Sequence, residues 1–219
     1  MESIERVNRV ENRFFPSNTY FLGESGSDGC IIIDPGVDFE RIHSAIKEHA
    51  LRPVGIVCTH GHFDHVGCIA ALKRDYPGIP YALHEADLKL ARSANFFAKL
   101  AKLPVWIEFV KPDLVMTGQS GVVNVGTFKM EFELFPGHSD GSCVIKHSSH
   151  LFGGDLIYRR GVGFNNFPGE NKTMLKSSIQ RLMATYDHDL MVYPGHGESG
   201  KLGWILQNNA ELNRFLNEQ

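Results

Sequence analysis

The segment from His60 to His65 places four metal-binding side chains within six consecutive residues: His60, His62, Asp64 and His65. Imidazole and carboxylate groups are ligands that suit zinc or iron, and four of them this close together seldom serve packing alone. In an extended stretch His60, His62 and Asp64 would project to one side and His65 to the other, an arrangement that can serve two metal ions. The apolar run 54–58 just before the segment predicts a buried strand. The chain therefore has to fold so that a metal centre lies at the carboxyl end of a strand, where open α/β sheets commonly place ligands.

Three later strands are predicted to end in turns that each carry one more candidate ligand. The alternating segment 127–135 leads to His138, the predicted hairpin 142–152 leads to Asp155, and the strand 190–193 leads to His196. Taken singly, a His or Asp beside glycine is most often an ordinary turn residue. Together with the first cluster these residues supply seven ligands, which suits two metal ions that share one bridging carboxylate.

The composition indicates a compact chain that can bury a large core. The 219 residues are 42% hydrophobic and 21% charged, with a formal net charge of -3. No linker-like segment or charge run marks a boundary, so we expect a single domain over residues 1–219. Lys and Arg form no basic block, which argues against nucleic acid as a partner. No pattern determines the oligomeric state.

The sequence also carries signals about location. Its first six residues are charged and lack the apolar segment of a secretory signal, and no stretch approaches the roughly 18 apolar residues of a membrane span. A cytoplasmic protein without a membrane partner is therefore expected. Free buried thiols rather than disulfides are predicted for the four scattered cysteines, which are Cys30, Cys58, Cys68 and Cys143.

Apolar residues at helical spacing predict helices over 38–50, 66–76, 85–103, 172–185 and 204–216. A group of large apolar residues lies within and after the third of these helices. Core packing is favoured for the group over a substrate wall or a dimer contact. Its members are Phe96, Phe97, Trp106, Ile107 and Phe109.

In order and spacing, four motifs of this chain resemble those of the metallo-β-lactamase superfamily, from near residue 15 to the last helix. They are Thr59-His60-Gly61-His62-Phe63-Asp64-His65, Pro136-Gly137-His138-Ser139-Asp140-Gly141-Ser142, Gly154-Asp155 and Pro194-Gly195-His196-Gly197. The resemblance implies an α/β fold, a four-layer αββα sandwich of two mixed β-sheets with metals at one edge.

The resemblance also implies roles for individual residues. The first metal would be held by His60, His62 and His138, and the second by Asp64, His65 and His196, with Asp155 bridging the two. Asp34, which follows the apolar run 30–33, matches a family carboxylate that supports the metal loop and fixes the orientation of its ligands.

Within the superfamily, Asp155 stands where many zinc β-lactamases use a cysteine, which argues against antibiotic hydrolysis. The chain length and the stretch 161–169 resemble single-domain relatives of glyoxalase II, the hydroxyacylglutathione hydrolases. The resemblance implies a thioesterase, in which a metal-bridging hydroxide converts an S-acylglutathione-like thioester to a hydroxy acid and a thiol. The cofactors would be two divalent metal ions, Zn²⁺ before Fe or Mn. Asp64 is also a candidate catalytic residue that steers or accepts a proton.

Recognition of the substrate follows the family pattern less closely. Glutathione-specific relatives carry a basic residue and an aromatic or acidic residue after the Gly-x-Gly of this stretch, where this chain has Phe164 and Asn166. The nearby cations Arg159, Arg160 and Lys172 are candidates for binding the tail of an anionic small-molecule thioester, with an exposed surface role as the alternative.

Three other functions are compatible with these residues. A persulfide dioxygenase would use one iron held by the equivalents of His60, His138 and Asp155. A lactone or phosphodiester hydrolase would direct the same nucleophile at another electrophile. A metal-binding protein without catalysis is disfavoured, because structural zinc normally has a closed tetrahedral shell rather than an open paired site.

Overall fold

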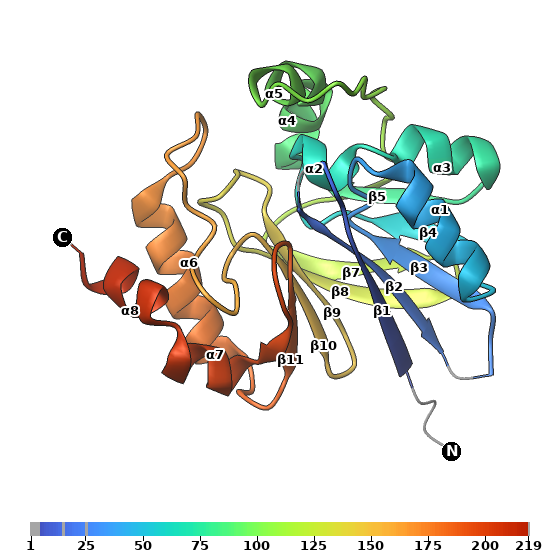
Figure 1. The fold of residues 1–219 in the computed structure, drawn as a ribbon. Helices are drawn as coiled ribbons and strands as arrows, with labels where there is room; N and C mark the ends of the chain where they lie inside the picture. Colours follow the sequence, from blue (N-terminus) through green and yellow to red (C-terminus); the bar gives the residue numbers. More distant parts are fainter. Residues whose placement is uncertain (1–4, 15, 25, 219) are drawn as a thin grey trace.

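Two six-stranded β-sheets lie face to face in the computed structural model, which describes residues 5–14, 16–24 and 26–218 (Figure 1). Residues 1–4, which begin the charged amino-terminal segment, lie outside this part of the chain. Among the described residues, no helix combines the length and the apolar character needed to cross a membrane.

The first sheet has the strand order β1-β2-β3-β4-β5-β6. Its strands pair antiparallel from β1 to β3 and parallel from β3 to β6, because helices connect β3 to β4 and β4 to β5. The bounds are β1 Glu5–Glu11, β2 Asn18–Glu24, β3 Gly29–Ile33, β4 Arg52–Val57, β5 Tyr81–His84 and β6 Leu114–Met116; the two helices are α1 Phe39–Glu48 and α3 Ile69–Asp75.

The second sheet has the order β12-β11-β10-β9-β8-β7. Only β10 and β11 pair parallel among its described strands, and the helix α6 (Lys172–Thr185) makes the connection between them. The bounds are β7 Ser120–Val125, β8 Phe128–Leu134, β9 Cys143–His147, β10 His150–Gly154, β11 Met191–Pro194 and β12 Gly200–Lys201. Both sheets are mixed, as the family resemblance implied.

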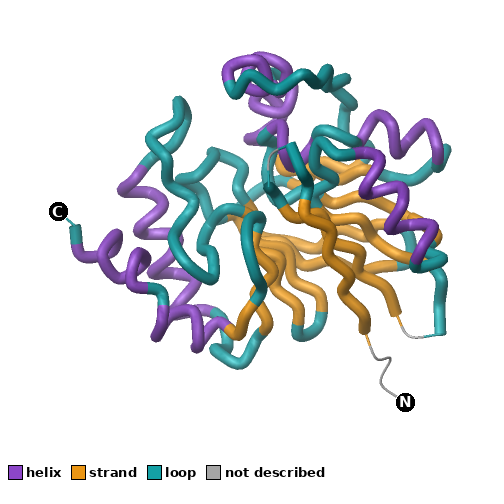
Figure 2. Tube along the Cα trace, in the orientation of Figure 1, coloured by secondary structure: helices purple, strands orange, loops and turns teal. Residues whose placement is uncertain are grey.

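Strand alternation divides the interior into three apolar layers. In β3, Ile31 and Ile33 face the second sheet, whereas Ile32 packs under α1 and α3. The helices α6, α7 (Leu202–Asn208) and α8 (Ala210–Asn217) cover the outer face of the second sheet, packing on residues such as Val144 and Leu151. Figures 1 and 2 show helices outside both sheets, so the predicted αββα sandwich is confirmed.

Three predicted helices are each interrupted. Residues 85–103 form the 3-10 turn η1 (Glu85–Asp87), α4 (Leu88–Arg92) and α5 (Ala94–Leu100). At the junction of α4 and α5, the hydroxyl of Ser93 donates to the carbonyl of Lys89 at 3.0 Å, a contact that often bends a helix. The helix predicted over 66–76 begins earlier, as α2 (Phe63–Val66), and restarts as α3. Near the carboxyl end, Asn209 separates α7 from α8 and caps α8.

Four strands were not predicted: β1, β6, β7 and β12. In β1, buried and exposed positions do not alternate strictly, and the strand is defined by its antiparallel pairing with β2. Short or partly exposed strands at sheet edges lack the apolar pattern that identifies a strand in the sequence.

The core interpretation of the large apolar group holds only in part. Ile107 is 3% exposed and belongs to the core, but Phe96 is 65% exposed and Trp106 85% exposed, so packing in the core was wrong for these two. Phe97 packs against the core edge and also lines a pocket described below. The four cysteines are buried and free, as predicted.

Candidate metal centre

One histidine group lies where the loop after β4 meets the loop after β8. His60 and His62 follow β4 and His138 follows β8, and one ring nitrogen of each lies within 4.8 Å of the others. The Nδ1 atom of His62 is 2.8 Å from the Nε2 atom of His138. Each sheet therefore contributes to this group, which only the packing of the two sheets brings together.

A second group lies beside it and combines α2 with the loop after β11. Asp64 and His65 belong to α2, and the Oδ2 atom of Asp64 is 3.3 Å from His65 Nε2 and 3.4 Å from His196 Nε2. The extended geometry expected for this segment is wrong beyond His62, because a helix begins at Phe63. Asp64 therefore lies with His65 and His196, and not with His60 and His62 as an extended segment would place it.

Asp155 lies between the two groups at the end of β10. One carboxylate oxygen, Oδ2, is 3.5 Å from His138 Nε2 and 3.3 Å from His196 Nε2, and Oδ1 is 3.5 Å from His65 Nε2. A single carboxylate thus contacts residues of both groups, which is the position that a bridging ligand needs.

Asp34 supports the centre from behind. Its carboxylate accepts hydrogen bonds from the backbone N–H of Thr59 at 2.7 Å and from the Thr59 hydroxyl at 2.7 Å, and lies 3.1 Å from His65 Nδ1. These contacts direct Nε2 of His65 toward Asp64 and Asp155. Asp34 has a φ of 52°, a backbone conformation that costs energy for a residue other than glycine and is often found at functional sites.

Burial and neighbouring charge set the protonation of the centre. Burial lowers the pKa of His62 to about 4, with a further contribution from His138. Burial opposes protonation of His196 as well, but the carboxylates of Asp155 and Asp64 outweigh it and raise the pKa of His196 to about 10. Without a metal ion, the carboxylates of Asp155 and Asp64 keep His196 protonated. A bound metal ion would displace that proton.

Three buried polar atoms of this centre have no hydrogen-bond partner among the described residues: His60 Nε2, His65 Nε2 and Asp155 Oδ1. Leaving buried polar atoms unpaired costs free energy, so native structures rarely retain several together without a ligand or water. All three are ordinary metal-ligating atoms. The donor set and its unpaired atoms fit a metal centre.

Asp87, at the end of η1, is a further residue of the site that the sequence analysis missed. Its carboxylate is 1% exposed and accepts hydrogen bonds from the backbone N–H groups of Gly61 and Gly141, each at 2.7 Å. It also accepts one from the hydroxyl of Ser139 at 2.7 Å. One buried carboxylate therefore joins the loop of His60 to the loop of His138, although no spacing pattern links residue 87 to either motif.

Two other residues that were not predicted contact the ligands. Burial and the nearby charge of Asp155 raise the pKa of Tyr158, and its ring lies edge-on to His196 with 5.6 Å between centroids. Glu170 lies 3.4 Å from His138 Nδ1, and its other oxygen accepts the backbone N–H groups of Asn165 and Phe167. The only available signal was the position of Tyr158 three residues after a predicted ligand.

A pocket of about 350 Å³ opens above the centre. The candidate ligands His62, Asp64, His138, Asp155 and His196 form part of its lining. Its other walls are Pro16 before β2, Phe63 of α2, the α5 region and the loop after β10, with mainly apolar side chains. These residues are Pro16, Phe63, Phe97, Leu100, Ala101, Tyr158, Asn165 and Phe167.

The three cations predicted to bind substrate lie outside this pocket. Arg159 and Arg160 line a neighbouring cavity next to His196. Arg159 pairs there with Glu198, and its guanidinium stacks over the ring of Trp204 at 4.6 Å. Lys172 pairs with Glu218 at 2.8 Å. Arg159 and Arg160 therefore border the centre only on the side of His196, and Lys172 lines neither of these two cavities.

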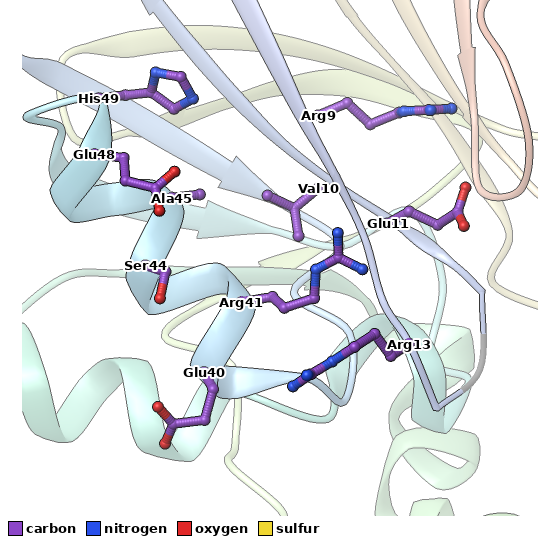
Figure 3. A pocket seen from close by; sticks show the side chains of 10 residues that line it. All are labelled: Arg9, Val10, Glu11, Arg13, Glu40, Arg41, Ser44, Ala45, Glu48 and His49. Carbon is purple, nitrogen blue, oxygen red and sulfur yellow. The ribbon is translucent and has the colours of Figure 1, made fainter.

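A larger cavity, of about 690 Å³, lies between β1 and α1 and shares no lining residue with the pocket above the centre. Figure 3 shows its side chains distributed along α1 and along β1 and the residues that follow. They carry charges of both signs, and Arg13 is already paired with the buried Asp38 at 2.7 Å. The cavity holds none of the candidate ligands.

Together, the sheets, the helices and the paired ligand groups define an αββα protein with a metal centre at the edge of its sheets. A family model described as the metallo-beta-lactamase superfamily matches residues 12–196. The chain belongs to the metallo-β-lactamase superfamily, as its motifs indicated.

Relatives named as hydrolases match most of the chain. The probable metallo-hydrolase YqgX of Bacillus subtilis (strain 168) is 30% identical over 201 residues, which cover 91% of this chain and 93% of that protein. The hydroxyacylglutathione hydrolase GloC of Haemophilus influenzae is 31% identical over 184 residues, or 83% of this chain and 86% of that protein.

Two solved structures are similar to the whole fold. TTHA1623 in a di-iron-bound form superposes with a TM-score of 0.80 and 29% identity, over 93% of this chain and 98% of that one. The BLEG-1 B3 metallo-β-lactamase superposes with a TM-score of 0.80 and 28% identity, over 94% and 99%. One is described by its iron and the other by its lactamase class, so likeness of fold selects neither metal nor substrate here.

Proposed function

We propose that this metallo-hydrolase superfamily member hydrolyses thioesters. The observation that carries the proposal is the convergence of seven candidate ligands from both sheets on a largely apolar pocket, with unpaired atoms on His60, His65 and Asp155. A purely structural zinc site closes a tetrahedral shell inside the protein, whereas five of these ligands line an accessible pocket.

The residues present fit two divalent ions. His60, His62 and His138 would hold one ion and Asp64, His65 and His196 the other, with Asp155 in contact with both. When bound, such ions lower the pKa of water to about 7 and polarise a carbonyl oxygen. Zinc is the metal first expected from the sequence; the similar di-iron protein makes iron the main alternative.

The chain's own residues favour a thioester as substrate. Apart from the candidate ligands, the described lining of the pocket offers no acidic or cationic side chain. Hydrolysis at this pocket therefore suits a leaving group that departs without a strong general acid, and a thiol, with a pKa near about 8.5, is such a group. Asp64, beside His196, is positioned to steer or accept a proton.

Partners and location are part of the proposal. We expect a small-molecule thioester as substrate, without nucleic acid or membrane, in the cytoplasm. The name of the similar Haemophilus influenzae hydrolase supports a thioester of a small thiol. Light scattering on the purified protein would determine the oligomeric state.

The proposal is tested by metal content and thioester hydrolysis measured on the same sample. Near two metal ions per chain with turnover is the expected result, and the variant His65→Ala should lose both. His188→Ala is the matched control, because His188 is exposed and lies outside the centre. Metal-loaded protein that leaves all thioesters intact would refute the proposal.

Two outcomes would identify the other functions. One iron per chain, with oxygen consumption on a glutathione persulfide, would indicate the dioxygenase. Turnover of lactones or phosphodiesters, with thioesters left intact, would indicate a lactone or phosphodiester hydrolase.

A further inference from the structure

The pocket above the metal centre is apolar where it meets solvent. Leu100, in the last turn of α5, is 58% exposed, and Phe167, in the loop after β10, is 48% exposed. Both line the pocket, and so do Ala101 and the ring of Phe97. Large apolar side chains gathered at a pocket and left exposed to water are typical of ligand-binding surfaces.

The same walls carry little that could bind a charged group. Beyond the candidate ligands, the polar side chains in the described lining are Tyr158 and Asn165. Lys89 is exposed and lines a neighbouring cavity, which shares His62, Phe97 and His138 with the pocket and also contains Asp140. The cavity beside His196 holds Arg159, which is paired with Glu198, and the exposed Arg160, and neither of them lines the apolar pocket.

The chemistry of thioesters decides which arm of the substrate enters. Common thiol carriers, glutathione among them, are polar or charged chains, and burying such groups without partners costs free energy. An apolar acyl chain gains free energy when it leaves water. The volume of about 350 Å³ is at the lower end of the roughly 300–1,000 Å³ of ligand pockets, which suits an acyl group of moderate size.

We propose that the natural substrates are thioesters with an uncharged, apolar acyl chain that lies between Leu100 and Phe167, while the polar thiol arm stays in solvent. This inference rests on the thioester hydrolysis proposed above. The sequence analysis suggested an anionic substrate tail held by Arg159, Arg160 and Lys172. The inference departs from that suggestion, because none of these residues lines the pocket.

The test is a series of N-acetylcysteamine thioesters with acetyl, butyryl, hexanoyl and succinyl groups. Hexanoyl and succinyl contain equal numbers of heavy atoms, so their ratio isolates charge from size. We expect kcat/KM to rise about fourfold for each methylene that is buried, until the pocket is full. The hexanoyl thioester should exceed the succinyl thioester at least tenfold. A succinyl rate equal to or above the hexanoyl rate would overturn the inference.

A pair of variants locates the preference. Leu100→Lys places a cation in the wall, and it should lower the hexanoyl-to-succinyl ratio at least tenfold. Phe96→Lys is the matched control: Phe96 is on the same helix and 65% exposed, but it does not line the pocket, so the ratio should stay within twofold. Equal changes in both variants would contradict a specific role for the pocket.

Binding separates this inference from the function on which it rests. Non-hydrolysable S-alkyl thioethers of the same thiol should bind more tightly as the chain lengthens, with an increasingly negative heat-capacity change in calorimetry. Chain-dependent binding without hydrolysis of any thioester would overturn the proposed function and retain the apolar pocket. Hydrolysis at rates that do not depend on acyl chain length or charge would retain the proposed function and overturn the inference of an apolar acyl chain.

Discussion

Asp87 accepts a hydrogen bond from the backbone N–H of Gly61 at 2.7 Å, between the candidate ligands His60 and His62. Its second carboxylate oxygen accepts the N–H of Gly141, three residues after His138. The contact explains how two loops from different sheets stay in register at the metal centre. Asp87 is therefore a positioning residue, because it holds backbone rather than a metal ion.

Asp87→Ala should weaken metal binding, because both loops lose their common acceptor. Loss of a group that orients metal ligands typically costs about 10- to 100-fold in affinity. Chelator competition on the folded variant would measure the change. Asp140→Ala, an exposed aspartate of the same loop, is the control and should bind metal like the parent protein. Unchanged affinity in Asp87→Ala would show that the loops are held by other contacts.

His62→Ala and His65→Ala should each lose metal and activity together while the fold persists. His62 belongs to one ligand group and His65 to the other, so the two variants test the groups separately. Elemental analysis gives the metal content, and circular dichroism checks the fold. Full activity in both variants would refute the ligand assignment.

Gly195→Ala should displace the bridging carboxylate. A Cβ atom at Gly195 would lie 1.9 Å from Asp155 Oδ1 and 2.8 Å from His65 Cε1, so one of these groups has to move. We expect at least about a tenfold loss of metal affinity, as for other disturbed ligand geometries. Gly153→Ala is the matched control in the same region, because its Cβ would meet only Val192 at an ordinary 3.5 Å. Equal effects in the two variants would contradict this explanation.

Tyr158→Phe removes the hydroxyl, whose pKa the nearby Asp155 raises, and leaves the ring in place. If this hydroxyl helps to orient the candidate bridging ligand, metal affinity should fall by about tenfold. Tyr193→Phe, which removes a hydroxyl that contacts His150 instead, should leave the affinity unchanged. Isothermal titration of both metal-free variants distinguishes the two effects, and identical affinities would remove Tyr158 from the site.

Asp38→Ala should destabilise the fold in a pH-dependent way. Burial alone would raise the pKa of Asp38, but hydrogen bonds from Arg13 and the N–H of Arg41 outweigh it and lower the pKa. A carboxylate with a lowered pKa stabilises the fold above its unfolded pKa of about 3.9 and loses that contribution as pH falls through the folded value. Loss of the helix cap should cost about 1–2 kcal/mol at neutral pH.

Urea unfolding of the metal-free proteins tests the Asp38 prediction. The difference in unfolding free energy between parent and variant should be constant near neutral pH and shrink below about pH 4. A difference that is independent of pH would mean that the charge of Asp38 contributes nothing.

The sequence by itself determined the kinds of atoms at the centre and the αββα class of the fold. All seven candidate ligands come together in the structure. The sequence could predict this because each ligand follows a strand with a visible apolar pattern, and the order of the motifs specifies the family. Their role as ligands stays a prediction. Side-chain chemistry and strand periodicity are local properties, so a single sequence expresses them directly.

Only the tertiary structure decided which residues surround that centre. Strand periodicity alone put Asp64 with His60 and His62, whereas the helix that begins at Phe63 places it with His65, the group that the family resemblance implied. Asp87 reached Gly61 through the packing of η1 against two loops. Arg159 and Arg160 line a cavity beside His196 and not the apolar pocket, whose walls come from segments separated by more than sixty residues, at Leu100 and Phe167. Contacts between such distant segments depend on the packing of whole layers, which no local pattern encodes.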